Sequence, residues 1–241
     1  MAGAYGEWKD YNAYSDFISS EGAPVFYARV DHVSVPLDKE GTGQVVVDFT
    51  PEPLTQDVSF AFHIEKTAGV VVDSLTAEIS GVPSTMELTT GLILAQKTYK
   101  LLFRPAYAAL PSAADSTSTE ALRCEAAVNI PGIVRSHTED MVTGPGILQI
   151  AIYTHYDYEE EGTQRKAAKV FHAGINLYHT LKECKSLQWD EEAGGYRQAS
   201  RSITVEIGTP LEIDKDGILN SGSTSTGLDQ WIPGETFEIE V

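Results

Sequence analysis

Histidine and acidic side chains are the residues of this sequence best suited to catalysis or metal binding. The chain has 6 histidines, and none of them stands in a spacing typical of a metal or catalytic motif. His155 precedes the acidic turn 159–161 and approaches His172 if the two segments form a hairpin. A zinc site or a general base needs a third convergent ligand, which the sequence does not identify. We therefore interpret these histidines as solvated strand residues, and we predict no metal site.

Two short acidic stretches resemble cation-binding motifs. Asp214-Lys-Asp-Gly217 is similar to the start of a calcium loop, but the later ligands and the closing glutamate are missing, so a turn between strands explains it. Asp115-Ser-Thr-Ser-Thr119 is similar to a cation motif of adhesive domains that follows a buried parallel strand, and no such strand is predicted here. We reject both as metal sites.

Motifs for nucleophilic or cofactor chemistry are missing as well. The sequence has no nucleophile elbow, phosphate loop, dinucleotide fingerprint or Cys-x-x-Cys pair. Glu191 and Glu192 are neighbours in a loop, which does not suggest the facing carboxylates of a glycosidase. We predict a protein that is not an enzyme, with no catalytic residues and no cofactor.

The two cysteines, Cys124 and Cys184, are too few for a disulfide scaffold. Alternation along 122–130 places Cys124 on an apolar face, where a thiol packs as a small hydrophobic group. We predict a buried thiol at Cys124, with a disulfide as the alternative if the protein is exported.

Composition and charge limit the partners. The 241 residues are 42% hydrophobic and 22% charged, as in an ordinary globular protein, but 17 basic and 35 acidic residues give a net charge of −18. Such a chain repels nucleic acid and anionic lipid. No apolar run reaches transmembrane length. The opening Met1-Ala-Gly-Ala-Tyr5 does not form a signal peptide, and either a native start or a trimmed export signal is consistent with it.

Period-two alternation of apolar and polar residues predicts that strands position all of these side chains. Val58, Phe60, Phe62 and Ile64 share one face, for example. A turn at 159–162 predicts a long hairpin. A strand is expected to break at Gly81 and Pro83, at the start of the element Ile79–Gly91. The predicted strands are 25–35, 43–49, 57–65, 70–79, 98–104, 122–130, 146–158, 166–178, 203–207 and 237–241.

The predicted fold is an all-β sandwich over 23–241, with a polar loop near 110–120 as an alternative domain boundary. Residues 1–22 are rich in aromatics: Tyr5, Trp8, Tyr11, Tyr14 and Phe17 recur at every third position. This spacing predicts one or two helical turns that pack on the sandwich. The alternative is an aromatic ladder that binds carbohydrate.

Several segments occur in an order typical of one family. They are the strand-and-turn element Val45–Leu54, the stretch Leu75–Gly91, the strand Gly146–Tyr153 and the ending 203–241. In this order the chain, from about residue 24 to 241, resembles the fimbrillin-like cell-surface lipoproteins of Bacteroidales, in their branch of unknown function.

The resemblance implies a transthyretin-like antiparallel β-sandwich that is exported to the cell surface or outer membrane. It implies a fimbrial subunit, a tip or anchor component, or an adhesin, whose partners are other fimbrial subunits or surface ligands of host or bacteria. Contacts would form by strand addition. The lipid-anchor cysteine of the family is missing, so any membrane contact would use an anchor outside this chain. The alternative is a surface glycan-binding module, which an open groove lined by Trp8, Trp189 or Trp231 would favour.

Overall fold

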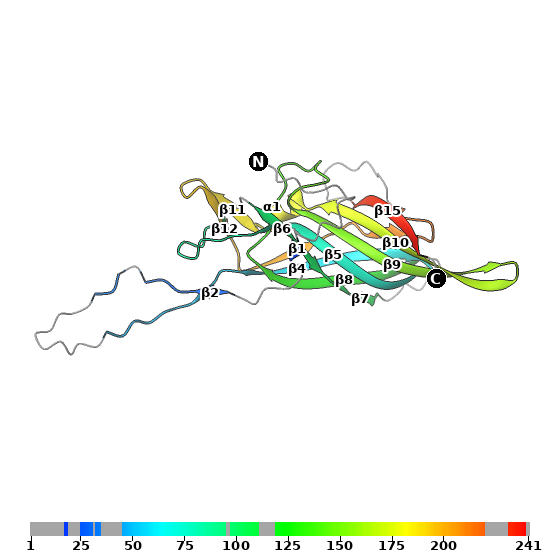
Figure 1. Cartoon of the computed structure of the whole chain (residues 1–241), viewed down its shortest axis with the longest axis horizontal. Coiled ribbons are helices and arrows are strands. Elements are labelled where there is room, and N and C mark those ends of the chain that lie inside the picture. Colours follow the sequence, from blue (N-terminus) through cyan, green and yellow to red (C-terminus); the bar gives the residue numbers. More distant parts are fainter. Residues whose placement is uncertain are drawn as a thin grey trace, which may run out of the picture.

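The computed structural model describes residues 17–18, 25–30, 32–34, 45–94, 97–110, 119–219 and 231–239. The molecule is elongated, with a body of β-strands in two layers (Figure 1). A long hairpin formed by β9 and β10 projects from one end of the body. At the other end, residues 25–30 and 32–34 leave the body together with residues 45–53, and we call these residues the arm.

The first layer is a sheet whose described strands have the order β1-β6-β5-β9-β10-β15. Neighbouring strands are antiparallel, except that β1 runs parallel to β6. The bounds are β1 (Phe17–Ile18), β5 (Val71–Pro83), β6 (Thr98–Phe103), β9 (Ile147–Glu160), β10 (Thr163–Asn176) and β15 (Trp231–Ile239). The predicted hairpin is confirmed: Glu161 and Gly162 have φ angles of 52° and 76°, as a tight two-residue turn requires.

The second layer has the strand order β13-β4-β8-β7, and β14 also pairs with β4. Both β13 and β14 run parallel to β4, while β8 is antiparallel to it. The bounds are β4 (Gln56–Thr67), β7 (Ala106–Ala109), β8 (Thr119–Ile130), β13 (Ser202–Glu206) and β14 (Leu211–Ile213). Smaller elements lie outside the two layers: β2 (Phe26–Tyr27) with β3 (Glu52–Pro53), β11 (Leu187–Asp190) with β12 (Gly195–Gln198), and the helix α1 (Tyr178–Glu183).

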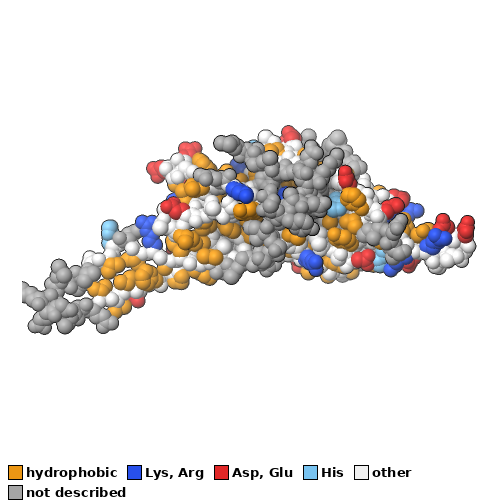
Figure 2. All heavy atoms as spheres, in the orientation of Figure 1, with side chains coloured by type: hydrophobic (Ala, Val, Ile, Leu, Met, Phe, Trp, Pro, Cys, Tyr) orange, Lys and Arg blue, Asp and Glu red, His pale blue; other side chains and the backbone are white. Residues whose placement is uncertain are grey.

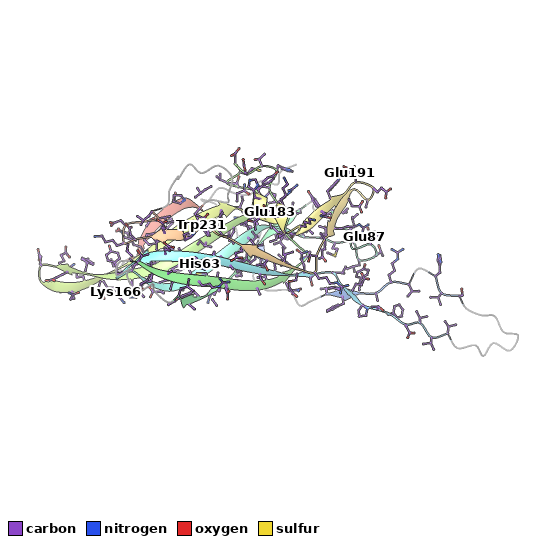
Figure 3. The ribbon with its side chains drawn as sticks, turned by 180° about the vertical axis from the view of Figure 1, so that it is seen from behind. His63, Glu87, Lys166, Glu183, Glu191 and Trp231 are labelled. Atoms are coloured by element: carbon purple, nitrogen blue, oxygen red, sulfur yellow. The ribbon has the colours of Figure 1, made fainter. Side chains whose placement is uncertain are left out.

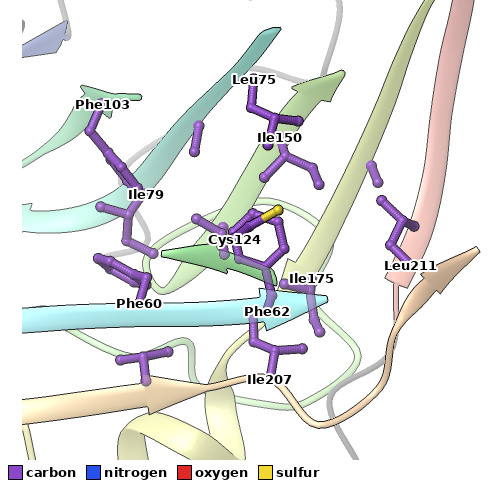
Figure 4. Close-up of a cluster of buried hydrophobic side chains, with 14 of the residues drawn as sticks. Phe60, Phe62, Leu75, Ile79, Phe103, Cys124, Ile150, Ile175, Ile207 and Leu211 are labelled. Carbon is purple, nitrogen blue, oxygen red and sulfur yellow. The ribbon is translucent and has the colours of Figure 1, made fainter. Parts of the chain in front are cut away.

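Alternating side chains from both layers meet in one core (Figure 4). Phe60 of β4 stacks on Phe103 of β6 with ring centroids 5.1 Å apart, and Phe62 meets the edge of Trp231 at 5.8 Å. Ile150 of β9 is fully buried in the same cluster. The prediction of an all-β sandwich is therefore confirmed.

The predicted strand 25–35 is confirmed only at Phe26–Tyr27, and the predicted strand 43–49 is wrong in its described residues. Of this region, only Phe26–Tyr27 and Glu52–Pro53 form strands, and 28–30, 32–34 and 45–51 run without strand pairing. Their alternation would suit a sheet, but they project away from both sheets (Figure 1). A two-stranded ribbon with no third strand or packed face has little stability of its own.

The predicted break at Gly81 is a bulge. β5 continues to Pro83, and its register against β6 shifts between Ile79 and Val82. Gly81 has a φ of +91°, and a Cβ there would lie 2.5 Å from the carbonyl oxygen of Val134. Only glycine fits this position, because the left-handed backbone and the close approach both exclude a side chain.

Other differences concern the ends of the chain and some short elements. Phe17–Ile18 form a strand, so the helical interpretation of 1–22 is wrong at these two residues. The other residues of 1–22 and the loop 111–118 lie outside the described residues. β10 ends at Asn176, and α1 follows it where the strand 166–178 was predicted to continue.

Candidate binding cleft

A cleft of about 370 Å³ lies beside the sandwich, between α1, the β11–β12 hairpin and the loop 131–138. These three elements come from separate parts of the sequence and meet at one end of the first sheet. The residues that line the cleft are Val134, Arg135, Ser136, His137, Tyr178, Leu181, Lys182, Lys185, Leu187, Gln188, Trp189 and Tyr196. Its volume falls in the range of about 300–1,000 Å³ that is usual for small-molecule sites.

Aromatic rings form one wall of the cleft. Trp189 and Tyr196 are opposite each other in the β11–β12 ladder, and their ring centroids lie 5.0 Å apart at an angle of 76°. Trp189 leaves 54% of its surface exposed, which is unusual for so large an apolar side chain. Trp231, in contrast, is buried in the core, and its indole Nε1–H donates to the carbonyl oxygen of Thr209 at 2.9 Å.

Basic side chains also line the cleft. Arg135, Lys182 and Lys185 are exposed, and His137 lies beside them in the lining. The described lining contains no Asp or Glu. None of the three cations forms an ion pair with another described residue. The charged side chains of the described lining are therefore basic, in a chain whose net charge is −18.

Acidic residues do occur on the elements that frame the cleft, but outside its lining. Glu183 is the last residue of α1, and Glu191 lies at the tip of the β11–β12 hairpin (Figure 3). Glu139 follows the loop 131–138, and its carboxylate contacts Nε2 of His179 at 2.5 Å. The carboxylate of Asp190 accepts from Nε of Arg197 at 2.7 Å.

Asn176 holds the basic loop in place from the end of β10. Its side-chain amide nitrogen lies within 3.0 Å of the carbonyl oxygens of Thr138, Glu139 and Met141. Its side-chain oxygen accepts from the hydroxyl of Ser136 at 2.8 Å and from the backbone N–H of Tyr178 at 2.9 Å. One buried amide thus ties the loop that carries Arg135 to the start of α1, the helix that carries Lys182.

A second buried network fixes the hairpin side of the cleft. Ser186 donates from its hydroxyl to Oε1 of Gln56 at 2.8 Å and accepts from the backbone N–H of Ile133 at 3.0 Å. Both Gln56 and Ser186 are fully buried. Gly132 packs so closely on Leu187 that an added Cβ would come within 2.6 Å of it. The cleft is therefore built from rigid supports, as a preformed binding site requires.

The histidines highlighted by the sequence do not come together. His155 is opposite Ala168 and His172 is opposite Ala151, so the two rings lie at different levels of the hairpin. His155 instead contacts Asp73 through Nδ1 at 2.7 Å. No group of three or more His, Cys, Asp or Glu residues suited to a metal occurs in the described part of the chain.

The stretch Asp214–Gly217 is a turn, as predicted. The carboxylate of Asp214 accepts from the backbone N–H groups of Asp216 at 2.7 Å and Gly217 at 2.8 Å. These bonds close the turn between Ile213 and Ile218, which form an isolated bridge.

Burial shifts the pKa of several groups outside the cleft. Cys124 is a fully buried thiol, as predicted, and desolvation raises its pKa to about 12. Burial lowers the pKa of His172, an effect that the nearby Glu235 carboxylate partly offsets. Burial raises the pKa of Glu78, although Nζ of Lys100 lies 2.8 Å from its carboxylate. These groups lie in or on the sandwich, and none of them lines the cleft.

The arm is a second surface that stands out. It exposes apolar side chains along both of its described segments, which are seen as orange spheres on the arm in Figure 2. Val33 is 48% exposed, Val46 75% and Phe49 59%. At its base, Leu54 donates its backbone N–H to the carbonyl oxygen of Val25 at 2.7 Å. Beyond β2 and β3, no backbone hydrogen bond joins the two described segments.

No protein-family model, curated protein or solved structure matches this chain. In the described residues, no helix is long and apolar enough to cross a membrane. The resemblance to fimbrillin-like proteins therefore stays a prediction, and the function is argued from the two surfaces described above.

Proposed function

We propose that this protein is a non-enzymatic, exported cell-surface protein of the fimbrillin-like kind, a fimbrial subunit, tip or anchor component, or adhesin. The observation that carries the proposal is the arm, whose described residues expose apolar side chains such as Val46 and Phe49 away from both sheets. An extended apolar segment that projects from the body is suited to pairing with a sheet edge of another chain, where backbone bonds give affinity and side chains set the register.

The neighbour that we propose is a second copy of this chain. Within the described residues, the first sheet ends at β1 and β15 and the second at β13 and β7, and we propose β7 and β15 as the edges that receive the arm. The inner faces are covered: Phe60 and Phe62 are each 1% exposed and Ile64 is fully buried. Strand addition is therefore proposed at an outer edge and not in a gap of the core.

Charge sets the condition under which association occurs. Each copy carries −18, so two copies repel each other at low ionic strength. Raising NaCl from about 0.1 M to about 1 M shortens the Debye length from about 10 Å to about 3 Å. The apolar contacts of the arm are not weakened by this change. Association through the arm is therefore expected to strengthen with salt.

Sedimentation velocity over a range of protein and salt concentrations tests the proposal. Val33 of the arm and Val142 of the body are both 48% exposed, so Val33→Asp and Val142→Asp form a matched pair. We expect Val33→Asp to weaken self-association by about tenfold or more, equal to about 1.4 kcal/mol, and Val142→Asp to leave it unchanged. A wild-type protein that stays monomeric at high salt, or two variants that behave alike, would contradict the proposal.

A second candidate function, surface glycan binding, is favoured by the position of Trp189. This ring lines the cleft and is 54% exposed, and an exposed tryptophan in a groove favours a glycan-binding module. Exposed aromatic rings offer flat apolar faces, and tryptophan combines such a face with a polar N–H. The two candidate functions use separate surfaces, so they are compatible in one protein.

A further inference from the structure

We infer that the cleft binds an acidic pyranose, a sugar ring that carries a carboxylate. The sugar ring lies on Trp189, and its carboxylate faces Arg135, Lys182 and Lys185. This inference deepens the glycan-binding candidate and rests on it. Size, the aromatic wall and charge each contribute one part of the argument.

Size and the aromatic wall select a small flat ligand. A volume of about 370 Å³ lies near the lower end of the range for ligand sites, so it suits one substituted ring better than a folded peptide. Trp189 presents an exposed face, while Tyr196 braces the indole from the side. Because the two residues are paired across β11 and β12, the indole is held in place before a ligand arrives.

Charge selects an anion. The chain as a whole repels negative ligands, so three cations without a described ionic partner in one cleft give a strong local contrast. The guanidinium of Arg135 lies 5.3 Å from the ring centre of Tyr178, which restricts its motion. A planar guanidinium binds a carboxylate through two parallel hydrogen bonds.

The backbone fixes the position of Lys185 at the end of α1. Lys185 has a φ of 53°, in the left-handed region that non-glycine residues seldom occupy. This conformation comes directly before Ser186, whose buried hydrogen bonds hold it in place. A neutral sugar can only offer hydroxyl and ring oxygens to the three cations, whereas a sugar carboxylate adds charge–charge attraction and a bidentate contact with a guanidinium.

Isothermal titration calorimetry of the full chain tests the inference with paired ligands. Methyl β-D-glucuronide and methyl β-D-glucoside differ at the carboxylate, and methyl galacturonide and N-acetylneuraminic acid serve as further acidic rings. We expect at least one acidic ring to bind about tenfold or more tighter than the glucoside, because only the carboxylate adds an ionic contact with the basic side chains. Failure of all three acidic sugars to bind, equal affinity for the glucoside, or equally tight binding of inorganic sulfate would overturn it.

Variants assign the contacts to this cleft. Trp189→Ala is expected to weaken the binding of acidic sugars by roughly tenfold, and Lys185→Gln by a similar factor with a smaller dependence on salt. Lys215→Gln, which removes an exposed lysine outside the cleft, serves as the control of equal charge and should bind as wild type does. Circular dichroism checks that each variant folds. Equal losses in Lys185→Gln and Lys215→Gln would place the effect outside the cleft and refute the inference.

The sugar test and the assembly test fail independently. Val33→Asp leaves the cleft intact, so it should bind sugar normally even where self-association is lost. Absence of sugar binding together with salt-strengthened self-association would sink the sugar inference alone.

Discussion

Replacing Gly81 with alanine tests whether the bulge in β5 supports the loop that forms the cleft. The added Cβ would lie 2.5 Å from the carbonyl oxygen of Val134 and 2.8 Å from the backbone nitrogen of Gly146. Both are backbone atoms, so neither moves without shifting the loop. The same region is tied to β5 by backbone hydrogen bonds from Val134 N–H to the oxygen of Gly81 (2.9 Å) and from Gly146 N–H to the oxygen of Ser80 (3.0 Å).

The expected magnitude has two parts. A side chain in the left-handed region costs about 1–2 kcal/mol. Displacing the loop breaks the two hydrogen bonds, at about 1 kcal/mol each. We therefore expect Gly81→Ala to lower the free energy of unfolding by about 3–4 kcal/mol.

Gly69 provides the control. It has the same φ of +91°, but no atom lies within 4 Å of the position that a Cβ would take there, so Gly69→Ala should cost only about 1–2 kcal/mol. Urea unfolding of both variants, compared at equal m-values, measures the difference. If the two variants lose equal stability, the bulge does not hold the loop and the reasoning is refuted.

Two further predictions concern buried titratable groups. In a Cys184→Ser variant, we expect the Cys124 thiol not to react with an aromatic disulfide reagent at pH 8 until urea unfolds the chain. The thiol is fully buried, and burial raises its pKa to about 12. Rapid reaction of the folded protein would contradict its burial. Burial lowers the pKa of His172 below its ordinary value of 6.5, so the neutral ring favours folding above that pH and this stability is lost as the pH falls through the folded-state pKa. The loss of unfolding free energy between about pH 7.5 and pH 5.5 should therefore be smaller in His172→Gln than in wild type, and an identical pH dependence would exclude this role.

The body of the sandwich could be predicted from the sequence because strands such as β4 and β13 show a clear alternation of apolar and polar residues. Phe60 and Phe62 in β4 and the turn at Glu161–Gly162 are local signals, and the structure agrees with them. The same signal failed in most of the described residues of 25–35 and 43–49. Alternation shows which side chains could share a face, but it does not show whether a neighbouring strand is present to pair with.

The candidate cleft is formed by contacts between segments that are distant in the sequence, and no local sequence pattern predicts such contacts. The Gly194-Gly195 pair between Trp189 and Tyr196 is a turn signal from which the β11–β12 hairpin could have been predicted. The position of Arg135 and Lys182 in one cleft could not have been predicted, because it depends on buried hydrogen bonds such as those of Asn176. The sequence predicts an interruption of the strand at Gly81. Whether the interruption is a turn or a bulge depends on the loop that packs against this residue.

The placement of β13 and β14 has a consequence for how the chain is made. Both strands pair with the same side of β4, yet they lie at 202–213, near the opposite end of the sequence from 56–67. During synthesis, β4 can pair with β8 early, whereas its other side waits for most of the remaining chain to emerge. Parallel pairing between such distant segments forms slowly. Until β13 and β14 emerge, one edge of the core strand β4 has no neighbour to pair with. We therefore expect misassembly with neighbouring chains mainly before these two strands are made.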